Sequence, residues 1–175
     1  MGLCMIVAVT GTPGTGKTSV CKLLKGVTVI DLHTLAEGHS ELFSRDKKRK
    51  SLDVDVKTLR KFIPKSDGAT ILDGHLSHHM KPDFAIVLRC SPEVLAKRLA
   101  KRRWSKAKVR ENIEAEAVDV ILIEAMDSCN EVFEIDTTEM TPLQVSKAVA
   151  EIIRGESGKY RPGNVDWSAE VMAWY

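Results

Sequence analysis

The segment Gly11-Thr12-Pro13-Gly14-Thr15-Gly16-Lys17-Thr18 matches the phosphate-binding loop pattern G-x-x-x-x-G-K-[ST] at every fixed position. Glycines allow such a loop to curl so that successive backbone N–H groups point at one anion. A helix that follows the loop adds the positive end of its dipole. The spacing then places Lys17 at the β- and γ-phosphates of a nucleotide, and the Thr18 hydroxyl at a Mg²⁺ ion.

The residues on either side of this loop support the same interpretation. Residues 3–9 form a continuous apolar run, which is typical of a strand buried on both faces of a parallel sheet. After the loop, Val20, Leu23 and Leu24 recur at helical spacing. Because strand, loop and helix coincide, nucleotide binding is favoured over a glycine-rich turn without a ligand.

Strand-like and helix-like segments alternate along the rest of the chain. Further strands are predicted at 27–31, 69–73, 84–89 and 132–136. Helical patterns occur at about 17–25, 55–62, 92–102, 105–129 and 142–154. This order predicts an α/β fold, a P-loop NTPase with a five-stranded parallel sheet and helices on both faces.

Length and composition limit the classes of protein that the chain can be. Its 175 residues suit one domain with a sizeable core, here residues 1–155, followed by a Gly- and Pro-containing extension at 156–175. The net charge of +2 gives no argument for a nucleic-acid binder. Four scattered cysteines without a C-x-x-C pair argue against a disulfide scaffold and a zinc site, and favour a reducing compartment. No apolar stretch approaches transmembrane length, so we expect no membrane partner.

A second motif ends the predicted strand at 69–73. The apolar run closes on Asp73, as in the Walker B arrangement, in which the carboxylate orients Mg²⁺. The alternative, a simple helix cap, is less favoured given the upstream loop. His75 lies two residues further on, and its ring could polarise a water or a phosphate oxygen. His78 and His79 suggest a cluster, but imidazole suits Mg²⁺ poorly, so we expect them at the surface of the following turn.

Charge is strongly segregated between residues 97 and 134. All charged residues at 97–110 are basic, and all those at 111–134 are acidic. Solvated helix faces with pairs four residues apart explain most of them. Arg98, Arg102 and Arg103 flank a predicted lid, and we expect one or two of them to contact phosphate.

Together, three motifs resemble one known family. GTPGTGKT, Asp73-Gly74-His75, and Arg-x-Trp followed by KVRENIEAEA are similar to the adenylate-kinase-like NTPases of archaea and the eukaryotic nucleus, over residues 3 to about 155. The resemblance implies a nucleoside monophosphate (NMP) binding insert at about 30–53 and a short lid at about 101–111. It implies a broad-specificity NMP kinase, with AMP as the first candidate acceptor, that also acts as an ATPase.

The resemblance also implies a set of partners and site residues. The partners are ATP, an NMP, a small-subunit ribosomal protein and pre-ribosomal RNA, in late maturation of the small ribosomal subunit. The location is cytoplasmic for an archaeal protein and nuclear for a eukaryotic one. The ATP-binding residues implied are Gly14, Gly16, Lys17, Thr18, Ser19 and Arg102. The catalytic residues implied are Lys17, Asp73, His75 and Arg102, and the Mg²⁺ ligands are Thr18 and Asp73. Arg103 stands where the family has glycine, so Arg102 and Arg103 could share or exchange the nucleotide contact.

Two functions therefore remain open from the sequence. In the first, ATP phosphorylates an NMP. In the second, ATP hydrolysis drives an assembly factor, His75 positions the attacking water, and the acidic stretch at 111–134 receives a basic ribosomal protein. A GTPase switch is disfavoured, because the chain has neither D-x-x-G after the loop nor N-K-x-D.

Overall fold

Five parallel strands form the central sheet of the computed structural model, which describes residues 4–39, 43–46, 51–64 and 66–174. The strands are β1 (Met5–Thr10), β2 (Thr28–Asp31), β5 (Ala69–Asp73), β6 (Phe84–Arg89) and β7 (Val132–Asp136). Their order across the sheet is β2-β5-β1-β6-β7, and every neighbouring pair is parallel. The predicted five-stranded parallel sheet is confirmed, with β1 at its centre.

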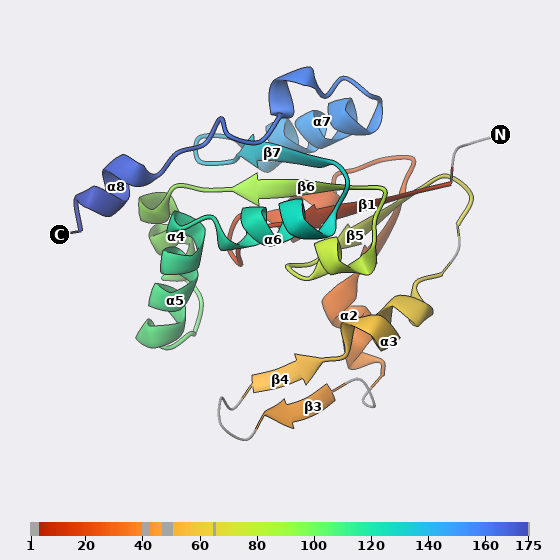
Figure 1. Ribbon diagram of the computed structural model, residues 1–175, viewed down its shortest axis with the longest axis horizontal. Helices are drawn as coiled ribbons and strands as arrows, with labels where there is room; N and C mark the ends of the chain where they lie inside the picture. The colour runs from red at the N-terminus through yellow and green to blue at the C-terminus, as the bar shows by residue number, and fades with distance from the viewer. Residues whose placement is uncertain (1–3, 40–42, 47–50, 65, 175) are drawn as a thin grey trace.

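Helices cover both faces of this sheet, as the alternation of elements predicted (Figure 1). On one face, α1 (Lys17–Cys21) and α7 (Pro142–Ile153) pack on side chains such as Val7 and Val9. On the other face, α6 (Val120–Ser128) packs on Ala8 of the same strand. Successive side chains of a strand point to opposite faces, which explains the continuous apolar run.

The predicted helix at 105–129 is two helices, α5 (Lys106–Ala117) and α6. The break lies at Asp119, which adopts a left-handed backbone with φ of 59°. Arg89 explains the position of the break, because its Nη2 atom donates to the Glu116 carbonyl (3.3 Å) and to the Asp119 carboxylate. A buried guanidinium thus satisfies groups at the end of one helix, and a periodicity pattern cannot register such a contact.

The segment expected to bind an NMP folds beside the β2 edge of the sheet. It contains α2 (Leu32–Glu37) and an antiparallel pair, β3 (Phe43–Asp46) with β4 (Ser51–Val54). The short helices α3 (Val56–Leu59) and η2 (Arg60–Phe62) follow. Figure 1 shows the pair projecting beyond α2 and α3, away from the central sheet. The sequence pattern did not predict this hairpin; residues 40–42 and 47–50 of the insert lie outside the described residues.

The predicted lid, at about 101–111, covers a turn between two packed helices and the first half of the second helix. After α4 (Pro92–Leu99), a turn leads into α5, and Leu95 and Leu99 pack with Trp104, Val109 and Ile113. The Ser91 side chain caps α4 by accepting from the Val94 N–H (3.3 Å).

The C-terminal extension contains η4 (Gly158–Tyr160) and α8 (Ser168–Met172) and contacts α7 and α4. The Tyr160 hydroxyl donates to Glu151 of α7 (2.6 Å), and Glu170 accepts from the Glu93 N–H of α4 (3.2 Å). Within the described part of the chain, no helix combines the length and apolarity needed to cross a membrane.

Candidate active site

The phosphate-binding loop lies at the carboxyl end of β1, between β5 and β6. Gly11 has φ of 134°, and a Cβ there would stand 2.3 Å from the Leu88 carbonyl oxygen of β6. Gly14 has φ of 103°, and a Cβ there would stand 2.8 Å from Leu95 Cδ1 of α4. Glycine is required at these two positions by both the backbone conformation and the close approach of neighbouring elements. The loop is thereby seated against the strand and helix that lead to the lid.

Lys17 begins α1 with its side chain buried beneath the loop. Its Nζ atom donates to the carbonyls of Gly11 (2.6 Å) and Thr12 (3.0 Å). Burial lowers the pKa of Lys17 to about 8, although the nearby Asp73 carboxylate acts in the opposite direction. At neutral pH the group is still mostly an ammonium ion, held where the motif predicts a phosphate contact.

The two residues predicted to bind Mg²⁺ lie together. Asp73 ends β5 opposite Val9 of β1, and the Thr18 hydroxyl hydrogen-bonds to its carboxylate. Burial raises the pKa of Asp73, whereas the Thr18 bond and the Lys17 charge lower it. A carboxylate and a hydroxyl suit Mg²⁺, which takes few protein oxygens and keeps several waters. Asp31 of β2, opposite Asp73 in register, adds a second acid that the sequence analysis missed.

The other residues predicted to bind ATP, Gly16, Thr18 and Ser19, lie at the start of α1. Gly16 is the N-cap of α1 with φ of 99°, and Thr18 and Ser19 are exposed on the first turn of this helix. No hydrogen bond to the Ser19 side chain is among the contacts described, so its predicted phosphate contact stays a prediction.

His75 lies exposed beyond the end of β5. The surrounding protein still removes part of the water from the ring, and this desolvation, followed by the Lys17 charge, lowers the pKa of His75. The ring is therefore neutral at pH 7 and can accept a proton. Its backbone carbonyl accepts a hydrogen bond from the Thr10 hydroxyl (3.3 Å), which ties it to β1.

The three arginines near the lid have different environments. Arg98 donates to the Thr137 hydroxyl (3.2 Å), the Thr137 carbonyl (2.8 Å) and the Thr138 carbonyl (3.3 Å), so its guanidinium is engaged in holding the loop after β7. The phosphate role considered for Arg98 is not supported. Arg102 stacks over the Trp104 ring at 4.8 Å, and its charge contributes to the lowered pKa of Lys17. Arg103 is exposed. Arg102 is therefore the lid arginine whose field reaches the loop.

The expected surface position of His78 is wrong. His78 lies in η3 (Ser77–Met80) with no exposed surface, and its Nδ1 atom is 2.9 Å from the Thr10 hydroxyl. Burial, aided by His79 and His75, lowers the pKa of His78 to about 3. A four-residue turn offers no periodicity from which its inner face could be predicted. His79 is half-buried beside it.

A buried ionic network under the loop was also missed. Arg89 at the end of β6 donates to Glu116 (2.7 Å) and Glu134 (2.6 Å), and the Thr12 hydroxyl of the loop donates to the other Glu116 oxygen (2.5 Å). Burial would lower the pKa of Arg89, but the carboxylates of Glu116 and Asp119 outweigh it and raise that pKa. The feature of the sequence that could have indicated this network is Arg89, a charged residue at the end of an otherwise apolar strand. Acids of the segment 111–134 are therefore used inside the protein.

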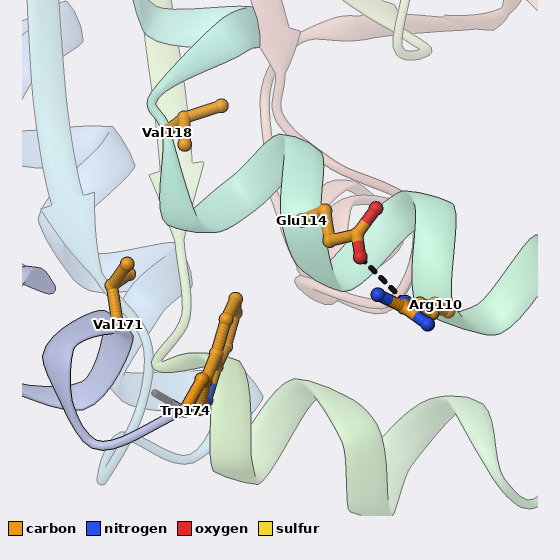
Figure 2. A pocket seen from close by; sticks show the side chains of 5 residues that line it. All are labelled: Arg110, Glu114, Val118, Val171 and Trp174. Carbon is orange, nitrogen blue, oxygen red and sulfur yellow. Dashed lines mark hydrogen bonds and ion pairs between the residues drawn. The ribbon is translucent and has the colours of Figure 1, made fainter.

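The end of the tail contacts α5. Figure 2 shows Val171 and Trp174 facing α5, where a pocket of about 200 Å³ is lined by these residues with Arg110, Glu114 and Val118. Arg110 Nε donates to Glu114 Oε1 along the helix (2.6 Å; Figure 2). Trp174 remains 47% exposed, so it is only partly buried against α5.

Comparisons with known proteins bear on the family of this chain. A family model described as "AAA domain" matches residues 7–119. A protein named "Putative adenylate kinase" from Archaeoglobus fulgidus is 48% identical over 172 residues, which cover 95% of this chain and 94% of that protein. A protein of the same name from Methanocaldococcus jannaschii is 41% identical over 174 residues, covering 96% of each.

Solved structures bear on the fold. A shikimate kinase from Acinetobacter baumannii, solved with shikimate, has a TM-score of 0.54 and 14% identity over 88% of this chain and 95% of that one. Thymidylate kinase from Candida albicans has a TM-score of 0.50 and 12% identity over 87% and 92% of the two chains. At such identities the likeness concerns architecture alone.

Proposed function

Because this chain belongs to the adenylate-kinase-like family of P-loop NTPases, we propose that it transfers the γ-phosphate of ATP to a nucleoside monophosphate. The observation that carries the proposal is the meeting of the Lys17 ammonium with the hydrogen-bonded pair of Thr18 and Asp73 at one edge of the sheet. The charge of Arg102 also contributes to the lowered pKa of Lys17. Ligands of open α/β sheets bind at this carboxyl edge.

The reaction needs positioning and cations more than it needs a covalent intermediate. An oxygen of the NMP phosphate forms a bond to the γ-phosphorus, and the bond from that phosphorus to the β–γ bridging oxygen breaks, leaving ADP and a nucleoside diphosphate. The acceptor is already an oxyanion, so little general-base help is required. Lys17 would neutralise charge on the β- and γ-phosphates, and Arg102 would stabilise the transferred group.

The residues present fit the magnesium ion that such chemistry uses. Thr18 and Asp73 would hold it, and when bound it supplies positive charge between the β- and γ-phosphates. The insert at about 30–53 would receive the NMP, with AMP as the first candidate acceptor, and the lid at about 101–111 would exclude water.

A simple product assay tests the kinase function. The chain is incubated with Mg·ATP, alone and with each NMP, and ADP and free phosphate are measured separately. We expect AMP to increase ADP formation at least tenfold without matching phosphate release, because the γ-phosphate goes to the acceptor. Adenosine, which lacks the accepting phosphate, serves as the control. An ADP yield that no NMP changes would contradict the kinase function.

A second function, ATP hydrolysis in an assembly factor, is supported by the neutral ring of His75. An exposed imidazole that is not protonated at pH 7 can position or deprotonate an attacking water. The resemblance of the motifs extends this proposal to late maturation of the small ribosomal subunit, through a ribosomal protein. The surface available to such a basic partner excludes Glu116 and Glu134, which are buried.

Replacing His75 separates the two chemistries. In His75→Ala we expect ATP hydrolysis to fall by about 10²-fold, the usual contribution of a general base. AMP-dependent ADP formation should stay within about threefold, because an oxyanion acceptor needs no base. His75→Asn keeps a polar group at the position and serves as the matched variant. Equal loss of both activities would rule out a water-handling role.

A further inference from the structure

Three side chains from two elements gather beside the active site without a role in it. His78 and His79 come from η3, and Glu124 comes from α6, which η3 contacts. Each offers one ligand atom, and the three atoms all lie within 4.8 Å of one another. Among the residues that the structure describes, this is the group of histidine and acidic side chains with the spacing of a metal site.

The most informative atom is Nε2 of His78. The side chain has no exposed surface, and within the described contacts this nitrogen has no hydrogen-bond partner. It points at Glu124 Oε2 across 3.4 Å. That separation is long for a hydrogen bond. It equals the distance between two ligands that each stand about 2.0–2.1 Å from a tetrahedral ion, which is about 3.4 Å.

A hydroxyl group holds the opposite side of the His78 ring, and a second hydroxyl contacts the His79 ring. His78 Nδ1 lies 2.9 Å from Thr10 Oγ1, and His79 Nδ1 lies 3.3 Å from Ser128 Oγ. Metal-binding histidines commonly use their second nitrogen in this way, which fixes the ring and its tautomer. Both rings are therefore oriented before any ion arrives.

We propose that His78, His79 and Glu124 bind a divalent transition-metal ion of the Zn²⁺ type. Two imidazoles and one carboxylate form a ligand set that zinc accepts, with a fourth position left to water. The same set is unsuited to Mg²⁺, which prefers oxygen ligands, so this site is chemically distinct from the pair of Thr18 and Asp73. Glu124 is 44% exposed, which gives an ion access from solvent.

The competing explanation is a proton shared between His78 and Glu124. A neutral buried imidazole and a half-exposed carboxylate would then form a long, weak contact, and no metal would bind with a defined stoichiometry. The two explanations differ in what titration with a metal ion shows, independently of any nucleotide or phosphoryl transfer.

The test is a titration of the full chain with Co²⁺. It is carried out without nucleotide and in the presence of excess Mg²⁺. We expect one equivalent to bind with the visible absorption of tetrahedral Co²⁺, and Zn²⁺ to displace it. Glu124→Gln and His79→Ala should each weaken binding at least tenfold. Both residues are partly exposed, so these variants can be compared as folded proteins. Asp127→Asn, an exposed acid on the same helix, is the matched control and should leave binding unchanged.

Cysteine is the main competing ligand. Cys4 is exposed, and the Cys129 thiol contacts the His78 carbonyl (3.4 Å). Cys4→Ser and Cys129→Ser should therefore retain Co²⁺ binding. The wild type with bound Co²⁺ should show no thiolate-to-cobalt charge-transfer band. Zn²⁺ should also raise the melting temperature of the wild type and not that of Glu124→Gln. Unchanged affinity in both ligand variants, or a thiolate band that the serine variants abolish, would overturn the site.

Discussion

Lys17→Met lowers kcat/KM for NMP-dependent ADP formation by about 10³-fold, which corresponds to about 4 kcal/mol of transition-state stabilisation. Lys17 is the cation held directly beneath the loop, with its Nζ atom on the Gly11 and Thr12 carbonyls. Methionine keeps the length and apolar packing of the buried side chain and removes only the charge. Steady-state kinetics with ATP and AMP measure the loss, and circular dichroism checks the fold.

The pH dependence gives this prediction a second readout. Burial lowers the pKa of Lys17 to about 8, and only the protonated form attracts phosphate. ATP affinity of the wild type should therefore fall as the pH rises above 8, by up to about tenfold per pH unit. Lys17→Met should lack this fall, whereas Lys25→Met, at an exposed lysine, should behave as the wild type. A Lys17→Met variant with more than a tenth of the activity would contradict the assigned role.

Arg89→Met lowers the free energy of unfolding by about 3–5 kcal/mol, because it leaves buried carboxylates without their partner. The guanidinium is 1% exposed and binds Glu116 and Glu134, which are 2% and 4% exposed. Methionine fills similar volume, so the loss reports the missing charge more than a cavity. Urea unfolding measures this loss in the free energy of unfolding. The slope of that free energy against urea concentration should stay unchanged.

Comparison with an exposed arginine separates this effect from a general loss of packing. Arg154→Met removes an arginine that is 58% exposed and pairs with Glu156, and it should cost less than about 1 kcal/mol. A loss of that small size in Arg89→Met would show that the network contributes little.

The sequence predicted the parts of this site that depend on neighbours along the chain. The loop from Gly11 to Thr18 and the strand ending in Asp73 are local patterns, and the structure brings Thr18 and Asp73 into hydrogen-bonding contact. What joins them is the parallel pairing of β1 with β5, which follows from the alternation of strands and helices. The first and last residues of the strands were also predicted to within two positions, because each strand is a local run of apolar residues.

Contacts between segments that lie far apart in the chain could not be predicted from the sequence. His78 appears as one of two histidines in a polar turn, and only the packing of η3 against β1 and α6 buries it. Arg98 lies in a basic run typical of phosphate contact, yet the carbonyls of Thr137 and Thr138 engage it. In both cases the deciding partner lies dozens of positions away, where no periodicity or motif connects the two residues.

The two oxygens of Glu116 join the end of α5 to the phosphate loop. One oxygen accepts from the Thr12 hydroxyl of the phosphate loop, and the other accepts from Arg89 and the Cys90 N–H (3.2 Å). Glu116 stands near the end of α5, so that end of the helix is fixed to the nucleotide site while the Lys106 end is free of this anchor. The two ends lie about 15 Å apart. A rotation of α5 by about 20° around Glu116 would therefore move the residues next to Arg102 by about 5 Å. In the proposed kinase, a small tilt around this pivot would be enough to turn Arg102 toward or away from the γ-phosphate.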